Sequence, residues 1–580
     1  MDNRNLLLAV VLSGLLILGW DLGMRFFYPE ASLTAPMDAA EPAAQTSAAG
    51  APDTVKVASD LGSDAKPAQK VDLAAALASP DRVAIDTPRI AGSINLVGAR
   101  IDDIVLKDYR QTVAKDSGPV RLFAPESTPD QYFAEFGFVT GGARQPSNAR
   151  WQADGAKLTP ETPVTLTRTD ASGITYTIRF TVDQDYMITA EQSATNSGTN
   201  AAIIQPFALI KRTDKNATPD QFIAHSGPVG VFGGTLWDPH SYKEMAEIGR
   251  ETPEGAPSWL GFTDQYWLTA LVPAKGKADN AGFRSLGNDL FRSDLIYAAS
   301  TVPVGGSISQ KTGLYAGAKE SQILDKYEDS GITYFGKAIS WGWFEIFEKP
   351  FLWLLRILNG LVGNFGVAII LLTVIIRGLM FPIAQKQFAS MAAMKALQPK
   401  MKSIQERFKD DKQRQQQEIM KLYKDEKVNP LAGCLPLVIQ IPIFFALYKV
   451  LVLAIEMRHE PFVFWIKDLS APDPAHVLNL FGMLPYDVPG FLAIGPLAIL
   501  LGITMWLTFK LNPSAMDPVQ QQMFSIMPWI LMFVMAPFAA GLLLYWVTSN
   551  LLTLAQQSYL YSRHPQLKAA SAAADKAAKG

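Results

Sequence analysis

The sequence has few of the residues that carry metal and redox chemistry. Among its 580 residues there is one cysteine, Cys434, which lies in an apolar stretch and has no partner for a disulfide within the chain. The five histidines are not spaced from one another as metal ligands are, and no glycine-rich phosphate-binding loop is present. We therefore expect no metal site, no cofactor and no catalytic residues, and we predict that the protein is not an enzyme.

Charge is also scarce and almost balanced. Charged residues make up 18% of the chain and the net charge is −2, so nothing in the overall charge suggests direct binding to nucleic acid. The chain is too long for one compact domain. Its two halves differ, because residues 30–335 have the composition of a soluble protein and most of residues 340–562 are apolar.

The first 28 residues form an apolar segment with Arg4 near its start. No small-residue cleavage site ends the apolar run, which also continues past the length of a signal peptide, so residues 1–28 predict an uncleaved transmembrane anchor. Asp21 and Arg25 interrupt its outer half. Residues 29–80 are rich in alanine and proline and have few large apolar side chains, which predicts a flexible linker.

Residues 81–333 alternate polar and apolar side chains, with many β-branched types. The pattern is clearest over Ile174–Val182, and turn residues such as Ser172–Gly173 punctuate it. Alternation with a period of two and short intervals between turns predicts a large antiparallel β-sandwich domain. We find no catalytic set of residues in it and expect a binding or scaffolding domain.

An aromatic, amphipathic segment at residues 334–350 precedes a long apolar region. It predicts a helix that lies in the membrane interface, although an ordinary aromatic belt is an equal alternative. Residues 351–562 then predict a core of five transmembrane helices. The fourth run is short and contains two prolines, so it could form one kinked element with the fifth, but their summed length fits two spans. The five apolar runs are Leu352–Phe381, Leu431–Ile455, Phe491–Phe509, Phe524–Phe538 and Gly541–Tyr561.

The distribution of basic residues predicts the orientation of this polytopic α-helical membrane protein. Lysine and arginine are concentrated in residues 382–430 and recur in the tail, residues 563–580, whereas residues 456–490 contain only Arg458 and Lys467. The positive-inside rule places the first two segments in the cytoplasm. Six spans with both termini in the cytoplasm satisfy every loop, and the β domain then lies outside the cytoplasm.

The basic segment at residues 383–429 has a helical pattern of its own. Apolar residues recur at intervals of three and four, and Asp410–Asp411 interrupts them, which predicts a cytoplasmic helical hairpin. A stripe of methionines suits an adaptable binding surface, but the core of a self-packed hairpin is the favoured interpretation. The residues that we expect to make contacts are Met391, Met394, Lys395 and Lys400.

Arg377 lies inside the apolar run Val367–Pro382. A charge at the centre of a membrane helix costs roughly 2.5–3.5 kcal/mol on insertion scales, although near a helix end the side chain can extend to the interface. Thr373 lies four residues earlier, on the same helical face. No acidic residue sits in the middle of a later span, so Arg377 indicates a hydrated cavity and an acidic group that arrives from outside the protein. Other polar residues of the spans are Gln440, Thr504, Ser525, Thr548, Ser549, Asn550, Gln556 and Gln557.

Several sequence blocks resemble the YidC membrane protein insertases. They occur in the order expected for that family, and the large β domain after a first anchor is similar to its Gram-negative form, in which this domain is periplasmic. The blocks are Thr373–Pro382, Met391–Lys400, Lys427–Pro436, Gln440–Tyr448, Phe464–Ser470 and Gly541–Asn550.

The resemblance implies a membrane protein insertase and chaperone of the bacterial inner membrane. It implies a hydrophilic groove, open to the cytoplasm and to lipid, in which the arginine attracts acidic residues of nascent membrane proteins. The implied partners are these substrates, membrane lipids, the Sec translocon, and the ribosome or signal recognition machinery at the hairpin. At Tyr545–Trp546 the family often has two aromatic residues, and the second is tryptophan here. The groove residues that we expect are Arg377, Thr373, Gln440, Ser525, Tyr545, Trp546 and Asn550.

Two other classes of protein fit less well. A secondary transporter with an intramembrane arginine site is the main alternative, but it needs paired halves or discontinuous helices, and we find no internal repeat. An intramembrane protease needs paired aspartates, or a serine with a histidine, within its spans. His459, His476 and His564 all lie outside the predicted spans.

Overall fold

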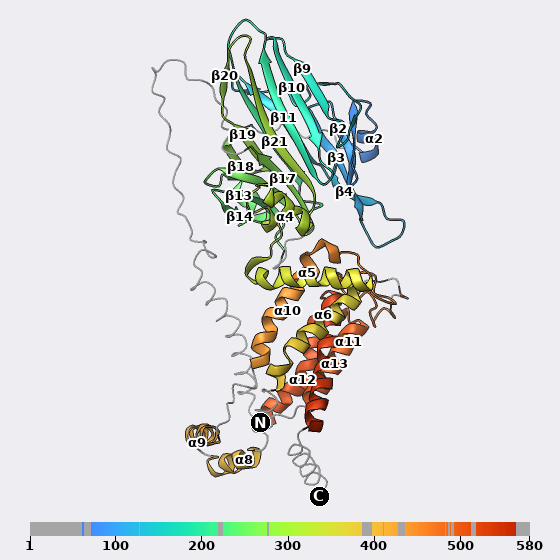
Figure 1. Ribbon diagram of the computed structural model, residues 1–580, viewed down its shortest axis with the longest axis vertical. Coiled ribbons are helices and arrows are strands. Elements are labelled where there is room, and N and C mark those ends of the chain that lie inside the picture. The colour runs from blue at the N-terminus through green and yellow to red at the C-terminus, as the bar shows by residue number, and fades with distance from the viewer. Residues whose placement is uncertain are drawn as a thin grey trace. The chain divides into compact units, whose positions relative to one another are not determined.

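The computed structural model in Figure 1 describes the β domain and most of the helical region. The predicted anchor at residues 1–28, most of the predicted linker and the tail after Arg563 lie outside the described residues. The described residues are 61–62, 71–126, 128–218, 224–274, 278–385, 397–409, 411–426, 435–481, 483–484, 486, 488, 492–511 and 518–563.

Two β-sheets account for most of the chain before residue 320. Among the described residues, the first sheet has twelve strands, with the order β15-β18-β19-β12-β5-β3-β2-β1-β8 and with β4, β6 and β20 beside this path. Every pair is antiparallel except β1 with β8. The strands are β1 (Arg82–Asp86), β2 (Ile90–Asn95), β3 (Arg100–Arg110), β4 (Pro119–Phe123), β5 (Tyr132–Thr140), β6 (Ala143–Arg144), β8 (Lys157–Leu158), β12 (Ala202–Thr213), β15 (Arg250–Glu251), β18 (Ala278–Gly287), β19 (Leu290–Tyr297) and β20 (Ser300–Val302).

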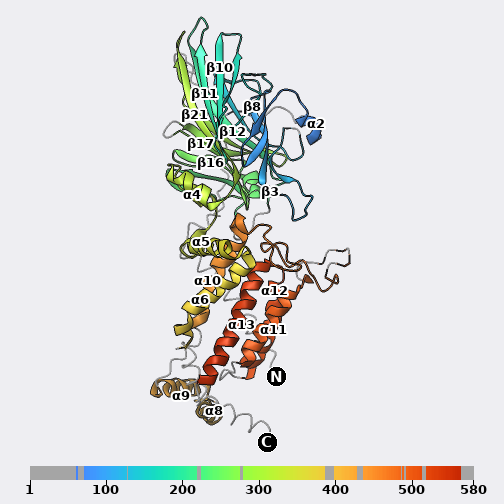
Figure 2. The same cartoon turned by 45° about the vertical axis from the view of Figure 1, so that its right-hand side comes forward.

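The second sheet has nine strands in the described residues, with the order β14-β13-β16-β17-β21-β11-β10-β9-β7. In β10 the alternate residues from Ile174 to Val182 are buried, as the sequence pattern predicts. Figure 2 shows β10, β11 and β21 running together as long neighbouring strands. The strands are β7 (Gln152–Ala153), β9 (Val164–Thr169), β10 (Ile174–Val182), β11 (Met187–Asn196), β13 (Gly227–Phe232), β14 (Thr235–Trp237), β16 (Pro257–Thr263), β17 (Trp267–Pro273) and β21 (Ser307–Ala318).

Side chains from the two sheets form one buried core. The rings of Phe136 on β5 and Phe180 on β10 lie 5.7 Å apart, so the sheets pack face to face through aromatic contacts. Gln192 on β11 crosses this core and donates hydrogen bonds to the carbonyls of Gly137 and Phe207. Gly137 has to be a glycine here, because a Cβ would lie 2.6 Å from the Phe207 ring.

Two features lie within residues 29–80, the range for which we predicted a flexible linker. A short helix, α2 (Leu73–Leu77), begins at Asp72, whose side chain accepts a hydrogen bond from the Ala74 amide. Leu61 is 5% exposed and packs with five apolar residues of the first sheet. Those residues are Phe133, Val139, Phe207, Leu209 and Ile296.

The helical region begins with two short segments and then α5 and α6. We expected an amphipathic helix over residues 334–350 and one apolar run over Leu352–Phe381, but α5 covers Glu345–Val362 and a break follows it. Gly363 has a φ of +67°, which favours glycine, and the Asn364 side chain caps α6 by accepting from the Val367 amide. These elements are η2 (Phe335–Ala338), η3 (Gly342–Phe344), α5 (Glu345–Val362) and α6 (Phe365–Leu379), and the β domain before them contains the helices α3 (Tyr242–Ile248) and α4 (Ser321–Asp329).

The fourth and fifth apolar runs form two separate helices, α12 and α13. Backbone hydrogen bonds join the start of α13 to the loop before α11, since the Ala540 amide donates to the Ala471 carbonyl at 2.7 Å and the Gly541 amide donates to the Leu469 carbonyl at 2.9 Å. Within the described residues, no helix is both long enough and apolar enough to cross a membrane. The remaining helices are α10 (Leu435–Leu453), η5 (Ile455–Met457), α11 (Pro496–Leu511), α12 (Pro518–Met535) and α13 (Ala540–Arg563).

The basic segment contains two helices, α8 (Gln398–Arg407) and α9 (Lys412–Asp425), which contact each other. Asp411 caps α9, and the side-chain Nε2 of Gln415 donates to the Gln405 carbonyl across the connection. Lys400 forms an ion pair with Glu426 on the surface of this hairpin. The other predicted contact residues, Met391, Met394 and Lys395, lie outside the described residues.

Candidate functional site

Arg377 is half-buried near the end of α6 and is held by a hydroxyl group. Its Nε and Nη2 atoms both donate to Ser549 Oγ on α13, with an Nε–Oγ distance of 3.0 Å. Gln556, further along α13, donates to the Arg377 carbonyl at 3.4 Å. Among the described residues Arg377 forms no ion pair, so its charge meets dipoles and no carboxylate.

Ser549 is the residue of this cluster that sequence reasoning missed. It is one of the polar residues noted in the last run, but we did not predict it as a groove residue. The signal that could have identified it is its position four residues after Tyr545 and seven before Gln556, because this spacing puts the three side chains on one face of a helix. Ser549 is 1% exposed, and this burial makes a hydrogen-bond partner necessary.

A second hydrogen bond adjoins the first along α13. Gln440 Nε2 on α10 donates to the hydroxyl of Tyr545 at 2.5 Å, and Tyr545 lies one turn before Ser549. Thr373 lies one turn before Arg377 on α6, but it is fully buried and its hydroxyl donates to the Ile369 carbonyl within its own helix. Helices α6, α10 and α13 thus bring together four of the seven predicted residues, with the hydroxyl of Thr373 already satisfied.

The other three predicted residues make contacts elsewhere. Asn550 Nδ2 donates to Thr504 Oγ1 on α11 at 3.2 Å, and the Trp546 ring lies 5.1 Å from the ring of Phe444 on α10. Ser525 is exposed on α12 and donates to the Gln522 carbonyl of its own helix. Asn550 directly follows Ser549, and one residue turns a helix by about 100°, so the two side chains face different neighbours.

A carboxyl group is buried elsewhere in the helical region, between α5 and α10. Glu348 has no exposed surface, and its carboxylate lies 3.9 Å from Lys449 Nζ, too far for a hydrogen bond. Neither Glu348 oxygen has a hydrogen-bond partner among the described residues. Burial disfavours the charged form and raises the pKa of Glu348 to about 7. Lys449 instead donates to the carbonyls of Ser340 and Trp341.

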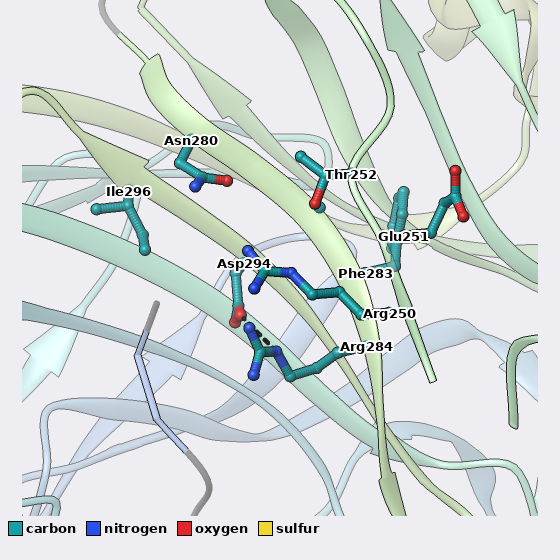
Figure 3. Close-up of a pocket in the computed structure, with 9 residues that line it drawn as sticks. Arg250, Glu251, Thr252, Asn280, Phe283, Arg284, Asp294 and Ile296 are labelled. Carbon is teal, nitrogen blue, oxygen red and sulfur yellow. Dashed lines mark ion pairs between the residues drawn. The ribbon is translucent and has the colours of Figure 1, made fainter. Parts of the chain in front are cut away.

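The β domain has a small polar pocket, shown in Figure 3. Asp294 lies at its centre, where Arg292 Nε donates to it at 2.6 Å and Arg284 forms an ion pair at 3.4 Å. The cavity has a volume of about 10 Å³, which is room for one water molecule. This pocket is too small for a substrate. Among the described residues, no group of acidic, histidine or cysteine side chains is arranged to hold a metal ion.

Comparison with known proteins adds to this geometry. Residues 82–354 match the model of the YidC periplasmic domain, and residues 357–567 match that of the 60Kd inner membrane protein. Two proteins named membrane protein insertase YidC are each 43% identical to this chain over 97% of its length. One is from Zymomonas mobilis subsp. mobilis and is covered to 96%, and the other is from Nitrobacter hamburgensis and is covered to 95%.

A solved structure of an active YidC insertase, with its first transmembrane domain resolved, is also similar. The alignment covers 82% of this chain and 92% of that one, with 18% identity and a TM-score of 0.35.

Proposed function

We propose a mechanism from the premise that this chain belongs to the family of YidC membrane protein insertases. The protein is therefore a membrane protein insertase of the inner membrane with a periplasmic β-sheet domain and a helical insertase core. The family is not enzymatic, so the mechanism has to rest on binding and on the local environment. Nascent membrane proteins are its substrates.

The proposed topology has six spans with both termini in the cytoplasm and the core made of α6, α10, α11, α12 and α13. The excess of basic residues in 382–430 supports this orientation. Helix α5 is proposed to lie in the interface, because four of its exposed apolar residues recur on one face and Leu352, Leu355 and Leu358 are buried on the other. The four residues are Ile346, Trp353, Ile357 and Leu361.

Arg377 is proposed to be the docking charge for acidic residues of a substrate. The observation that carries the proposal is that its guanidinium group is held by Ser549, whose neutral hydroxyl orients the charge without cancelling it. A cation without a protein counter-ion in an apolar core needs water or an incoming anion. A hydrophilic groove that opens to the cytoplasm and to lipid provides both. The acidic leading segment of a substrate then enters, and its apolar helix moves into lipid.

The remaining predicted residues are proposed to line the same groove. Gln440 and Tyr545 form a polar link between α10 and α13 beside Arg377, and Asn550 forms one to α11. Trp546 gives the groove an aromatic surface and Ser525 extends its polar lining, while Thr373 lies one turn before Arg377 with its hydroxyl bonded within its own helix. The cytoplasmic hairpin, with Met391, Met394, Lys395 and Lys400, is proposed to receive the substrate. Membrane lipids, the Sec translocon and the ribosome or signal recognition machinery are its proposed partners.

Photocrosslinking with a stalled nascent chain tests the groove. A photoreactive residue at position 377 or 373 should crosslink to the leading segment of an acidic substrate. The matched control is position 379, because Leu379 lies on the same helix but is 77% exposed. Equal crosslinking at 379 and 377, or crosslinking at 379 alone, would contradict the proposed groove.

A further inference from the structure

A second cavity, of about 350 Å³, lies at the end of the β domain near Arg458, the residue after η5. This volume lies within the range of small-molecule sites. Its lining is polar and cationic, since three arginines face a single aspartate. The lining residues are Gln111, Val120, Arg121, Leu122, Tyr132, Arg212, Asn216, Asp264, Trp267 and Arg458.

The base of the cavity is held by an ion pair and hydrogen bonds, and its one carboxylate is already occupied. Arg212, whose side chain is 1% exposed, donates to Asp264 at 2.9 Å and lies 4.3 Å from the centre of the Tyr132 ring. Asp264 also accepts hydrogen bonds from the Thr218 amide and the Ser226 hydroxyl, each at 3.2 Å. The aspartate therefore balances Arg212, and because Arg121 is paired with Asp103, Arg458 sets the net positive charge of the cavity.

These two arginines lie at the rim. Arg121 forms an ion pair with Asp103, which is outside the lining, and it keeps further N–H groups for a ligand. Arg458 donates to the carbonyls of Arg110 and Gln111 at 2.8 and 3.2 Å, and its guanidinium carbon lies 5.3 Å from the centre of the Trp267 ring. Within the described residues Arg458 forms no ion pair, and neutral carbonyls leave its charge in place.

We propose that this cavity binds a phosphate group carried on a small polyol, as in a glycerol phosphate. Guanidinium groups match the geometry of phosphate oxygens with paired N–H donors. The amides of Gln111 and Asn216 can bond hydroxyl groups of the polyol, and Trp267 offers an apolar side for its carbon atoms. The same chemistry occurs in the headgroup of an anionic phospholipid and in a soluble phosphate ester, and the experiment has to separate these two sources.

The test uses the full-length protein in detergent. Calorimetric titration with glycerol 3-phosphate, at constant ionic strength, measures binding of the soluble ester. Co-sedimentation with vesicles of phosphatidylcholine alone, or with added phosphatidylglycerol, measures binding of the headgroup. We expect the double variant R121Q/R458Q to weaken binding of the preferred probe at least tenfold. The matched control Arg110→Gln removes a nearby charge whose side chain faces the carbonyls of Lys115 and Ser117, so it should leave binding unchanged.

The outcomes are distinct. Calorimetric binding that the double variant loses identifies a soluble ester, and a requirement for phosphatidylglycerol that it loses identifies a lipid headgroup. Binding that is equal in the wild type and the double variant, or no binding of either probe to the wild type, overturns the proposal. If the double variant lacks a normal melting transition, Arg458→Lys takes its place. It keeps the charge and loses the paired donors, so an affinity equal to that of the wild type counts against the site.

Discussion

Arg212 in the β domain is a buried cation and Arg377 in the helical core a half-buried one, and their hydrogen-bond acceptors differ. Arg212 donates to a carboxylate, Asp264, and is enclosed by the rings of Tyr132 and Tyr242. Arg377 donates to the hydroxyl of Ser549. A carboxylate cancels the charge, whereas a hydroxyl only orients it. The difference separates an arginine paired with a carboxylate inside the β domain from one that keeps no carboxylate partner among the described residues, which we propose as the docking charge for a substrate.

The largest effect on stability should come from removing Arg212, the arginine that is paired with a carboxylate. Arg212→Met leaves Asp264 buried and unpaired, and we expect a loss of about 3–5 kcal/mol in the free energy of unfolding of the β domain. Urea unfolding, followed by tryptophan fluorescence, measures it. The control Arg150→Met removes an arginine that is 67% exposed and should cost less than about 1 kcal/mol. Similar losses of unfolding free energy in the two variants would contradict the structural role of Arg212.

Substitution of Arg377, which has no carboxylate partner among the described residues, should show the reverse pattern, with a large loss of function and a small loss of stability. Arg377→Ala should impair insertion of substrates whose translocated segments are acidic, and Arg377→Lys should largely preserve it because the charge remains. Protease protection of substrates inserted into vesicles measures the effect. Full insertion of an acidic substrate by the alanine variant would refute the electrostatic mechanism. Substrates with few charges serve as the internal control.

Ser549→Asp would replace the hydroxyl group to which Arg377 donates with a carboxylate. An aspartate at this position gives Arg377 a carboxylate partner like that of Arg212, so we expect acidic substrates to insert poorly although the arginine is intact. Ser549→Ala removes only the acceptor, worth about 1.5–3 kcal/mol for a hydrogen bond to a charged group, and should reduce insertion less. The two variants can be compared in the same protease-protection assay. If alanine impairs insertion more than aspartate, the charge is not what matters.

Glu348 is an intermediate case, since its partner Lys449 is close but not hydrogen-bonded. Its pKa is raised to about 7 by burial, so the folded state binds this proton more tightly than the unfolded state does. Stability should therefore fall as the pH rises from about 4.5 to 7 and then level off. Melting temperatures between pH 5 and 8 should show this trend in the wild type and a weaker one in Glu348→Gln. The control Glu345→Gln removes a more exposed carboxylate whose charge adds to the raised pKa of Glu348, so it should weaken the trend less than Glu348→Gln does.

The smallest effect on insertion is expected from deleting the β domain, which contains Arg212. Deletion of most of residues 83–320 should leave insertion largely intact, because we find no catalytic group in the β domain. Complementation of a strain depleted of its own insertase, with membrane levels of the deletion checked by immunoblotting, measures this. Lost insertion by a stably expressed deletion would assign the β domain a direct part in the reaction.

The sequence predicted features that depend on a single helix or strand. The alternating pattern of β10 predicted its buried face, and Arg377 stood out because an isolated charge in an apolar run needs no partner to be noticed. The contact with Ser549 could not be predicted, since it depends on how α6 and α13 pack across 172 positions of sequence. The break at Gly363 was missed for another reason. Apolar residues continue on both sides of it, so hydropathy alone gives no boundary.

The hydrogen bonds from Ala540 and Gly541 to the preceding loop fix the first turn of α13 in place. Ser549 lies nine residues further along, about 13 Å from that anchor at 1.5 Å per residue. A helix attached at one end moves as a lever, and its displacement grows with distance from the attachment. Tyr545 lies about 7 Å from the anchor, so in such a motion it moves about half as far as Ser549. In the proposed mechanism, room for a passing substrate segment would therefore be made mostly at the far end of α13, beyond Ser549.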